Sequence, residues 1–391
     1  MVVVMLVVLP LLFMVSAAQA LQVPFGIKND RPESSASTLM APAVKSPKVF
    51  IVSMFKPEEE VWTSRMNFEH RLEIPGLAST SPYIRCTDNY DICQFTTGEG
   101  EINAAVSMAF LVSSPLFDLT KTYWLLAGIA GGEPSQVTTG SVTFARFAIQ
   151  VGLSFQIDSK ELSESYSNWT SGYFAYGTKD PWTYPKAVYG TESFELNDNL
   201  RTHVMKIAEQ YTGQLKLGDT DNQALRKLYN YPSANSPPSI KACDVTTSDG
   251  YFTGEVLANY VTDYSHMLTN GTAVYCASAQ EENATLEAFL RMATAGRIDF
   301  SRIIVMRSIS NFARSPAGMD PLDFFLHYPK GGFDHALDNL YIAGWPIVQD
   351  IVDRWGSDYR DGKYAASNYV GDIVGRLGQK PPYGRKKYGV H

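Results

Sequence analysis

Two short segments of the sequence carry residues suited to acid–base chemistry or to close ligand contact. The run Glu58-Glu59-Glu60 places three carboxylates in a row, and a positioned carboxylate can act as a general acid or base. Acidic residues also favour a helix N-terminus through the helix dipole, so the alternative is a solvated helix start. The segment 128–132, Gly-Ile-Ala-Gly-Gly, offers bare backbone that a ligand can approach closely.

Phosphate, metal and cofactor chemistry have less support. The loop Gly98-Glu-Gly100 lacks the Lys-Ser/Thr pair of a phosphate loop and contains no arginine, so we favour close packing of a helix on a strand there. The histidines show no metal-ligand spacing on any helix face, and we assign no metal and no cofactor. They are His70, His203, His266, His327, His335 and His391.

The charge balance argues against nucleic acid as a partner. The chain has 33 Lys and Arg against 40 Asp and Glu, a net charge of −7, whereas a protein that binds a phosphate backbone needs a basic surface. The basic stretch at 384–388 is too short to change this, and we interpret it as a solvated terminus.

Strand-like and helix-like segments alternate along the chain. Strands are expected at 48–53, 92–97, 123–127, 141–156 (several), 241–247, 272–279 and 302–308, and helices from near 58 and at 102–111, 196–211, 222–229, 254–268 and 281–294. This alternation predicts an α/β fold with a mixed, mostly parallel sheet flanked by helices. In such folds ligands bind at the carboxyl ends of the strands.

The N-terminal region predicts entry into the secretory pathway. Residues 1–20 form an uncharged apolar run ending in Ala18-Gln19-Ala20, which suits signal peptidase, although an uncleaved anchor is the alternative because about 20 apolar residues can span a bilayer. Residues 21–47 have the composition of a flexible leader. The next longest apolar stretch, 104–117, is too short to span a membrane, so we expect a secreted or cell-surface protein.

The remaining residues, 48–391, are expected to form one domain with an insertion at about 158–238. Four cysteines in a secreted context suggest disulfides, with Cys86 pairing Cys93 and Cys243 pairing Cys276. Buried free thiols are the alternative, because spacing does not fix connectivity. Sequons at Asn168 and Asn270 allow glycosylation if they are exposed; a third sequon, at 283–285, is less plausible.

Five segments, taken in order, resemble a known superfamily. They are Val49-Phe-Ile-Val-Ser-Met-Phe-Lys-Pro-Glu-Glu-Glu-Val61, Thr97-Gly-Glu-Gly-Glu-Ile-Asn-Ala-Ala105, Leu126-Ala-Gly-Ile-Ala-Gly-Gly132, Gln280-Glu-Glu-Asn-Ala-Thr285 and Val305-Met-Arg-Ser-Ile-Ser-Asn311. Together they resemble the purine nucleoside phosphorylase and methylthioadenosine nucleosidase superfamily. Within it, residues 48–380 are most similar to fungal proteins named purine nucleoside permeases. The resemblance implies a three-layer α/β/α fold and cleavage of an N-glycosidic bond through an oxocarbenium-like transition state.

The resemblance also implies catalytic residues. Glu60, the last glutamate of its run, matches the general base that activates water in the nucleosidase branch. Arg307 matches an arginine that keeps this carboxylate ionised. Ile129 replaces a serine that holds the water in that branch, which leaves the water site incomplete. Asn311 matches the Asp or Asn at the purine N7 edge, and an amide there suits a 6-oxopurine because it both donates and accepts; the alternative is an Asn that caps a turn.

Substrate-binding residues follow from the same resemblance. Ala130 and Gly131 are expected to approach the ligand through their backbone. Tyr251 is expected to stack on the purine with Phe252 beside it, although such aromatic pairs often serve packing alone. Glu281-Glu282-Asn283-Ala284 occupies the position of a Glu-Met-Glu-Ala motif whose final glutamate binds ribose, so either Asn283 makes a neutral contact, or Glu282 supplies the charged one, or sugar binding is weakened.

These residues predict a secreted or cell-wall hydrolase of purine nucleosides, in which water activated by Glu60 attacks C1′ while Asn311 stabilises the departing base. A phosphorylase that releases ribose 1-phosphate is the second enzyme hypothesis. A nucleoside-binding protein that assists uptake without catalysis is the third hypothesis, and a storage protein is the fourth. The sequence leaves the preferred purine open, and it leaves homo-oligomerisation open as well.

Overall fold

The computed structural model describes residues 43–169, 171–181, 183–328 and 331–384. The predicted signal peptide and residues 21–42 of the predicted leader lie outside these ranges. Of the remaining leader residues, Lys45 forms a β-bridge with Phe117, and its amide donates to the Leu116 carbonyl at 2.9 Å.

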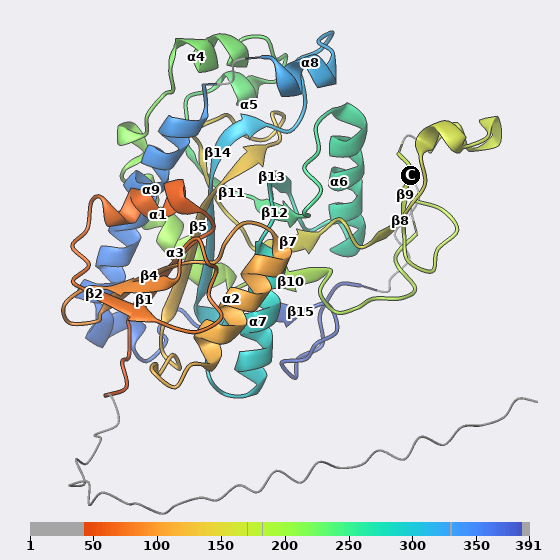
Figure 1. The fold of residues 1–391 in the computed structure, drawn as a ribbon. Coiled ribbons are helices and arrows are strands. Elements are labelled where there is room, and N and C mark those ends of the chain that lie inside the picture. The colour runs from red at the N-terminus through yellow and green to blue at the C-terminus, as the bar shows by residue number, and fades with distance from the viewer. Residues whose placement is uncertain (1–42, 170, 182, 329–330, 385–391) are drawn as a thin grey trace, which may run out of the picture. The chain divides into compact units, whose positions relative to one another are not determined.

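The described residues form an α/β fold around a mixed sheet, as predicted (Figure 1). The sheet order is β15-β10-β7-β12-β13-β5-β1-β4-β3-β2, with β14 paired to β5 and to β6, and β6 paired to β11. The neighbours of β1 are parallel to it, whereas the strands at both edges pair antiparallel. The strands are β1 (Val49–Ser53), β2 (His70–Glu73), β3 (Tyr83–Cys86), β4 (Ile92–Thr96), β5 (Tyr123–Gly132), β6 (Val142–Phe144), β7 (Phe147–Gln150), β8 (Ser154–Gln156), β9 (Tyr173–Ala175), β10 (Ser193–Glu195), β11 (Ile240–Ala242), β12 (Asp244–Thr247), β13 (Tyr275–Ala279), β14 (Ile303–Phe312) and β15 (Gly371–Asp372).

Helices cover both faces of this sheet. They are α1 (Lys56–Thr63), α2 (Glu101–Ser113), α3 (Asp198–Glu209), α4 (Thr220–Arg226), α5 (Pro232–Asn235), α6 (Glu255–Leu268), α7 (Glu282–Thr294), α8 (Pro321–Leu326) and α9 (Phe333–Asp353). Figure 1 shows α2 and α7 side by side in front of the sheet. The hairpin of β8 and β9 projects from the body of the domain at the right of this view.

The alternation of side chains along β1 explains why both faces need cover. Successive residues of a strand point to opposite faces, and every residue of β1 is buried. Phe50 and Val52 belong to the core that includes α2 and α7, whereas Val49 and Ile51 belong to the core that includes α1, α3 and α9. A strand that is apolar on both sides is typical of the centre of an α/β sheet.

The structure differs from the sequence prediction in three places. β5 and β14 each have ten residues and extend beyond the predicted strands, toward the site described below. The helices α8 and α9 and the strands β2 and β3 were not predicted. The segment 158–238 contains β10, which pairs with β7, and α3, which packs on α9, so part of the predicted insertion belongs to the core.

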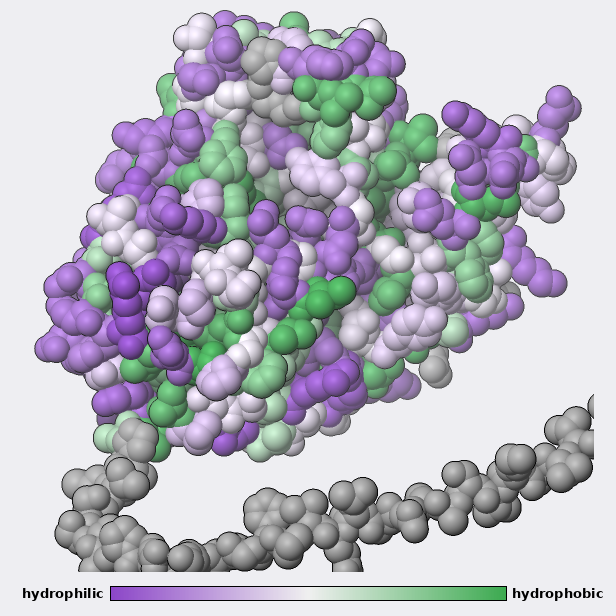
Figure 2. Space-filling view, viewed as in Figure 1, coloured by the Kyte–Doolittle hydropathy of each residue, from purple (hydrophilic) through white to green (hydrophobic). Residues whose placement is uncertain are grey.

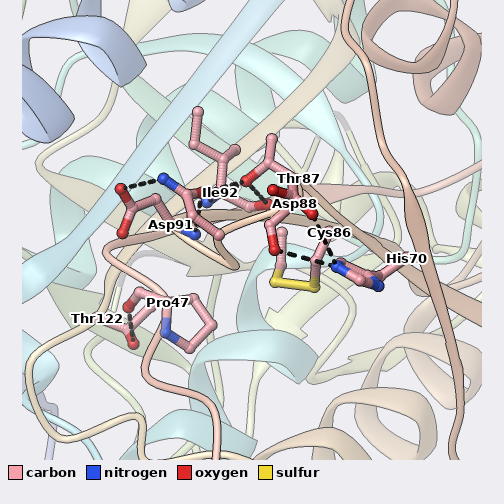
Figure 3. The surroundings of a disulfide bond; sticks show 10 residues. Pro47, His70, Cys86, Thr87, Asp88, Asp91, Ile92 and Thr122 are labelled. Carbon is pink, nitrogen blue, oxygen red and sulfur yellow. Dashed lines mark hydrogen bonds and ion pairs between the residues drawn. A yellow bond between two sulfur atoms is a disulfide. The ribbon is translucent and has the colours of Figure 1, made fainter.

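Both predicted disulfides are confirmed. Cys86 and Cys93 face each other across the antiparallel pair of β3 and β4, with their Cα atoms 4.1 Å apart. Figure 3 shows this bond beside His70, whose Nε2 lies 3.0 Å from the Asp88 carbonyl oxygen. Cys243 and Cys276 join the start of β12 to β13, with their Cα atoms 5.8 Å apart.

No helix in the part of the chain that the structure describes has both the length and the apolar character needed to cross a lipid bilayer.

Candidate functional site

A cavity of about 800 Å³ opens where β1, β5, β12, β13 and β14 end. Its wall residues follow these strands or form their last residues, which is where an α/β sheet is expected to bind a ligand. Loops before α4 and α9 complete the wall. The charged side chains that line it are Glu58, Glu99, Asp219, Glu281, Asp334 and Asp338, with Lys216 and Arg307 as cations and His335 as a titratable neighbour.

Glu58 is one of two buried carboxylates that line the cavity, and the other is Glu281. The side chain of Glu58 is fully buried, its Oε2 accepts from the Met54 amide at 2.7 Å, and its Oε1 accepts from the Ile129 amide at 2.7 Å. Burial raises the pKa of Glu58 to about 7, an effect that the nearby Arg307 opposes and Glu281 reinforces. A carboxyl that titrates near neutral pH can accept a proton under physiological conditions.

Glu60, the general base predicted from the sequence, lies elsewhere. Its side chain is 58% exposed, forms an ion pair with Lys56 at 3.4 Å and does not line the cavity. The reason is helix geometry: Glu58 and Trp62, four residues apart, share the inward face of α1, while Glu60 projects about 200° away from Glu58. The structure therefore moves the candidate base two residues toward the N-terminus.

Arg307 sits on β14 at the meeting point of several buried acceptors. Its Nη1 donates to the Ile129 carbonyl at 2.9 Å, its Nη2 donates to Glu281 at 3.0 Å, and its Nε donates to Glu282. Burial alone would lower the pKa of Arg307, but Glu282 and Glu281 together raise it, so the guanidinium stays charged. Ile129 thus bridges Glu58 and Arg307 through its backbone, as donor to one and acceptor from the other.

Asn311 reaches the cavity because β14 bulges beside it. The register of β14 against β5 shifts between Ile309 and Asn311, and Asn311 then lies opposite Gly131. Such bulges re-aim a side chain at the end of a strand. Asn311 Nδ2 donates to the Tyr251 hydroxyl at 2.8 Å, and the amide lines the cavity together with Ala130 and Gly131.

Aromatic side chains border the mouth of the cavity. Tyr251 is 63% exposed and its ring lies 5.4 Å from that of Phe325 on α8, and Phe252 also lines the cavity. Figure 2 shows a hydrophobic patch over α8 at the top of the molecule, where the exposed side chains of α8 include Leu322 and Leu326. The structure thus brings both predicted aromatic residues to the site.

Two predicted sugar-binding residues do not line the cavity. Asn283 is buried, accepts from the Thr247 hydroxyl at 2.6 Å and donates to the Thr191 carbonyl at 2.7 Å. Glu282 is fully buried against Arg307. The carboxylate of this segment that faces the cavity is Glu281, which also accepts from the Gly100 amide at 3.1 Å.

Sequence reasoning missed Glu58 and Glu281, although both stand within the segments that it selected. The spacing of Val61 and Trp62 relative to Glu58 could have indicated which glutamate faces inward, because residues three and four apart share a helix face. No comparable signal marks Glu281, which is the residue before the first turn of α7.

Comparison with known proteins gives a consistent set of relatives. A family model described as purine nucleoside permease (NUP) matches residues 46–364. A purine nucleoside permease of Candida albicans is 49% identical over 347 residues, which cover 88% of this chain and 85% of that protein. A probable purine nucleoside permease of Schizosaccharomyces pombe is 37% identical over 321 residues, which cover 80% of this chain and 91% of that protein.

Among solved structures, similar chains include two 5′-methylthioadenosine/S-adenosylhomocysteine nucleosidases. The protein from Neisseria meningitidis is 13% identical with a TM-score of 0.45 and covers 77% of this chain and 99% of its own. The protein from Helicobacter pylori is 12% identical with a TM-score of 0.46 and covers 78% of this chain and 99% of its own.

Proposed function

This chain belongs to the purine nucleoside permease family, and we propose that its cavity binds purine nucleosides and hydrolyses their N-glycosidic bond. The observation that carries the proposal is the buried Glu58 at the wall of the cavity, where burial raises the pKa of its carboxyl to about 7. A nucleoside-binding protein without chemistry has no need for such a group. A general base of this kind typically contributes about 10²–10⁴-fold to a rate.

The proposed step joins water to C1′ of the ribose. As the bond between C1′ and the purine nitrogen breaks, its electron pair leaves with the base, and a bond forms between C1′ and the water oxygen. Glu58 takes the proton that this oxygen loses, and Asn311 stabilises the charge that develops on the purine by donating a hydrogen bond. The departing base then gains a proton from solvent. The products are free ribose and a purine.

The charges of the residues that line the cavity favour hydrolysis over phosphorolysis. Arg307 already donates to Glu281, Glu282 and the Ile129 carbonyl, so each of its three nitrogen atoms has a buried acceptor and three of its five N–H groups are engaged. The other cationic lining residue is Lys216, which is exposed. A phosphate ion needs several donors on its oxygens, and six carboxylates line the same cavity.

The sugar and base contacts complete the proposal. We assign the ribose hydroxyls to Glu281, which lines the cavity, and the purine to the aromatic faces of Tyr251 and Phe252. Asn311 can donate to N7 and to the adjacent O6 of a 6-oxopurine, which are both acceptors on one edge of the base, and this favours inosine and guanosine.

Nucleoside capture for uptake is the second candidate, and the names of the relatives favour it. The two candidates differ in one observable. A capture protein binds inosine and releases it unchanged, whereas a hydrolase converts it to ribose and hypoxanthine.

The test uses purified protein with inosine, with and without added phosphate. We expect free ribose at a rate that does not depend on phosphate, a loss of roughly 10²–10⁴-fold in kcat for Glu58→Gln, and much smaller loss for Glu60→Gln. Ribose 1-phosphate formed only with phosphate would make the protein a phosphorylase. Inosine that binds without turnover would support capture instead. Loss of activity in Glu60→Gln alone would return the base to the position expected from sequence.

Secretion is proposed on the two disulfides and the apolar N-terminal run. Disulfides persist in oxidising compartments, and both pairs are formed here. The expected N-terminus of the mature protein is Leu21, which mass spectrometry of culture medium can check. An intact Met1 in the membrane pellet would instead indicate an anchor.

A further inference from the structure

The α7 end of the site holds a buried carboxylate that the proposed mechanism does not use. Glu282 is the first residue of α7 and is fully buried. One of its oxygens accepts from Arg307 Nε, and the other has no hydrogen-bond partner among the described residues. A buried carboxylate with an unpartnered oxygen lowers stability, so a contribution to function is the more economical explanation of its presence.

Glu282 and Glu281 determine which way the Arg307 guanidinium is drawn. Arg307 pairs with Glu281 at 3.0 Å and with Glu282 through Nε. Within the described residues it forms no ion pair with Glu58 at up to 4.0 Å, although both reach the same backbone unit at Ile129. The N-terminus of α7 favours both of these carboxylates through the helix dipole.

The ionisation of Glu58 depends on the fact that Arg307 pairs with Glu281 and Glu282 rather than with Glu58. A guanidinium that pairs directly with a carboxylate stabilises its charged form and makes it a weaker base. Glu58 instead receives its hydrogen bonds from two backbone amides, at Met54 and Ile129. The charge of Arg307 therefore lowers the pKa of Glu58 only in part, and burial outweighs it.

We propose that Glu282 is a positioning residue which holds Arg307 toward α7 and thereby leaves Glu58 able to accept a proton. The proposal rests on the proposed function in assigning the base role to Glu58. It adds a residue that touches neither the cavity nor the substrate, and it assigns a purpose to the buried pair of Glu282 and Arg307.

Other charged and titratable groups line the same cavity as Glu58 and must stay in place in a test. They are Arg307 on β14, Glu281 before α7, Glu99 before α2, Asp334, His335 and Asp338 on α9, and Lys216 and Asp219 before α4. Glu59, the neighbour of Glu58 on α1, points the other way to Arg85 at 2.9 Å. A substitution at Glu282 replaces none of these residues, and the group whose contacts it is meant to change is Arg307.

The test measures the protonation of Glu58 directly, without substrate. Infrared difference spectra between the protein and its Glu58→Gln variant isolate the carboxyl band of Glu58, whose midpoint is then followed with pH. In the Glu282→Gln background we expect this midpoint to fall by about one pH unit, because Arg307 loses one of its two carboxylate partners and its charge then acts more strongly on Glu58. The acid limb of kcat/KM for inosine should move by the same amount. Glu287→Gln is the control, because Glu287 lies on the same helix and pairs with Arg291 and Arg376.

Glu282→Asp gives a second variant, which keeps the charge but shortens the reach to Nε. We expect a smaller shift in the same direction. An unchanged midpoint in both folded variants would overturn the proposal, and so would failure of both to fold, since that assigns Glu282 a structural role. A shifted midpoint in a protein that never hydrolyses inosine would support the proposal while removing the proposed function.

Discussion

Glu58 and Arg307 approach each other over Gly128, with no room for a side chain between them. A Cβ atom on Gly128 would lie 2.6 Å from Glu58 Oε1 and 2.5 Å from Arg307 Nη1. Neither group can move freely, because Glu58 is held by the amides of Met54 and Ile129 and Arg307 by Glu281 and the Ile129 carbonyl. Glu58 and Arg307 can therefore keep these positions only if residue 128 is a glycine.

The first prediction concerns this glycine. Gly128→Ala should push Glu58 and Arg307 out of their hydrogen bonds, lowering kcat/KM for inosine by roughly 10²-fold or more and the free energy of unfolding by about 1–3 kcal/mol. Steady-state kinetics and urea unfolding measure the two effects. Gly213→Ala is the matched control, since nothing lies within 4 Å of a Cβ there. Unaltered kinetics in Gly128→Ala would show that the pair tolerates displacement.

The second prediction concerns the dependence of stability on pH. The pKa of Glu58 is about 7 in the folded protein against an ordinary value of 4.5, chiefly because of burial. Between these values the folded chain holds a proton that the unfolded chain has released. The free energy of unfolding should therefore fall as pH rises from 4.5 to 7, by about 3 kcal/mol from this group.

Urea unfolding of the wild type and of Glu58→Gln at pH 5 and pH 7.5 measures this effect. Glutamine does not titrate, so the variant should lose less stability over the interval, with a difference of about 2 kcal/mol. Parallel pH profiles for the two proteins would mean that Glu58 is already ionised at pH 5.

The sequence predicted the framework of the site better than the individual residues in it. The family that the five segments indicated is the one that the comparisons support, and Arg307, Asn311, Gly131 and Tyr251 do line one cavity. These residues stand at the ends of strands, and the mixed sheet places such ends together. A pattern of strands and helices was enough to predict that.

The sequence motif alone does not indicate which of two neighbouring carboxylates faces the cavity. Glu58 and Glu60 have the same chemistry, and only the inward face of α1, set by Val61 and Trp62, separates them. A shift of similar size places Glu281 at the cavity in place of Asn283. Such shifts depend on where each helix begins, and helix boundaries are the least certain part of a prediction from sequence.

The long helix α9 was missed for a different reason. Pro346 lies inside it, and an internal proline is ordinarily a signal that a helix ends. Here the burial of Leu340, Ile347 and Ile351 against the sheet holds the helix together. Tertiary packing thus overrides a local signal, and the N-terminal turn of α9 brings Asp334 to the cavity.

The third prediction concerns the base. Asn311→Ala should lower kcat/KM for inosine by roughly two to three orders of magnitude, the range expected for one oriented donor in the transition state. Asn311→Asp should shift preference toward adenosine, because a carboxyl accepts from the exocyclic amine and, when protonated, donates to N7. The ratio of kcat/KM for the two nucleosides measures this shift. Equal ratios in the wild type, Ala and Asp proteins would remove Asn311 from base recognition.

The last prediction concerns the charge of the substrate. Asp219, Asp334 and Asp338 line the cavity on the side of α4 and α9, and Glu99 and Glu281 add to the negative field. A phosphate on the nucleoside would enter this field at a Coulomb cost that grows as the cavity excludes water. A nucleoside 5′-monophosphate should therefore bind at least tenfold more weakly than inosine, which corresponds to about 1.4 kcal/mol of binding free energy.

Competition assays with inosine 5′-monophosphate at low and high salt measure this difference, which should shrink as salt screens the field. Asp219→Asn should reduce the difference in affinity between nucleoside and nucleotide several-fold. Asp219 also caps α4 by accepting from the Asn222 amide. Asparagine caps helices as well as aspartate does, so α4 should keep its cap in the variant. Asp320→Asn is the control, since Asp320 caps α8 in the same way and does not line the cavity. Equal affinity for nucleoside and nucleotide in the wild type would show that the phosphate lies outside the cavity, and the carboxylates near α4 and α9 would then play no part in selecting the substrate.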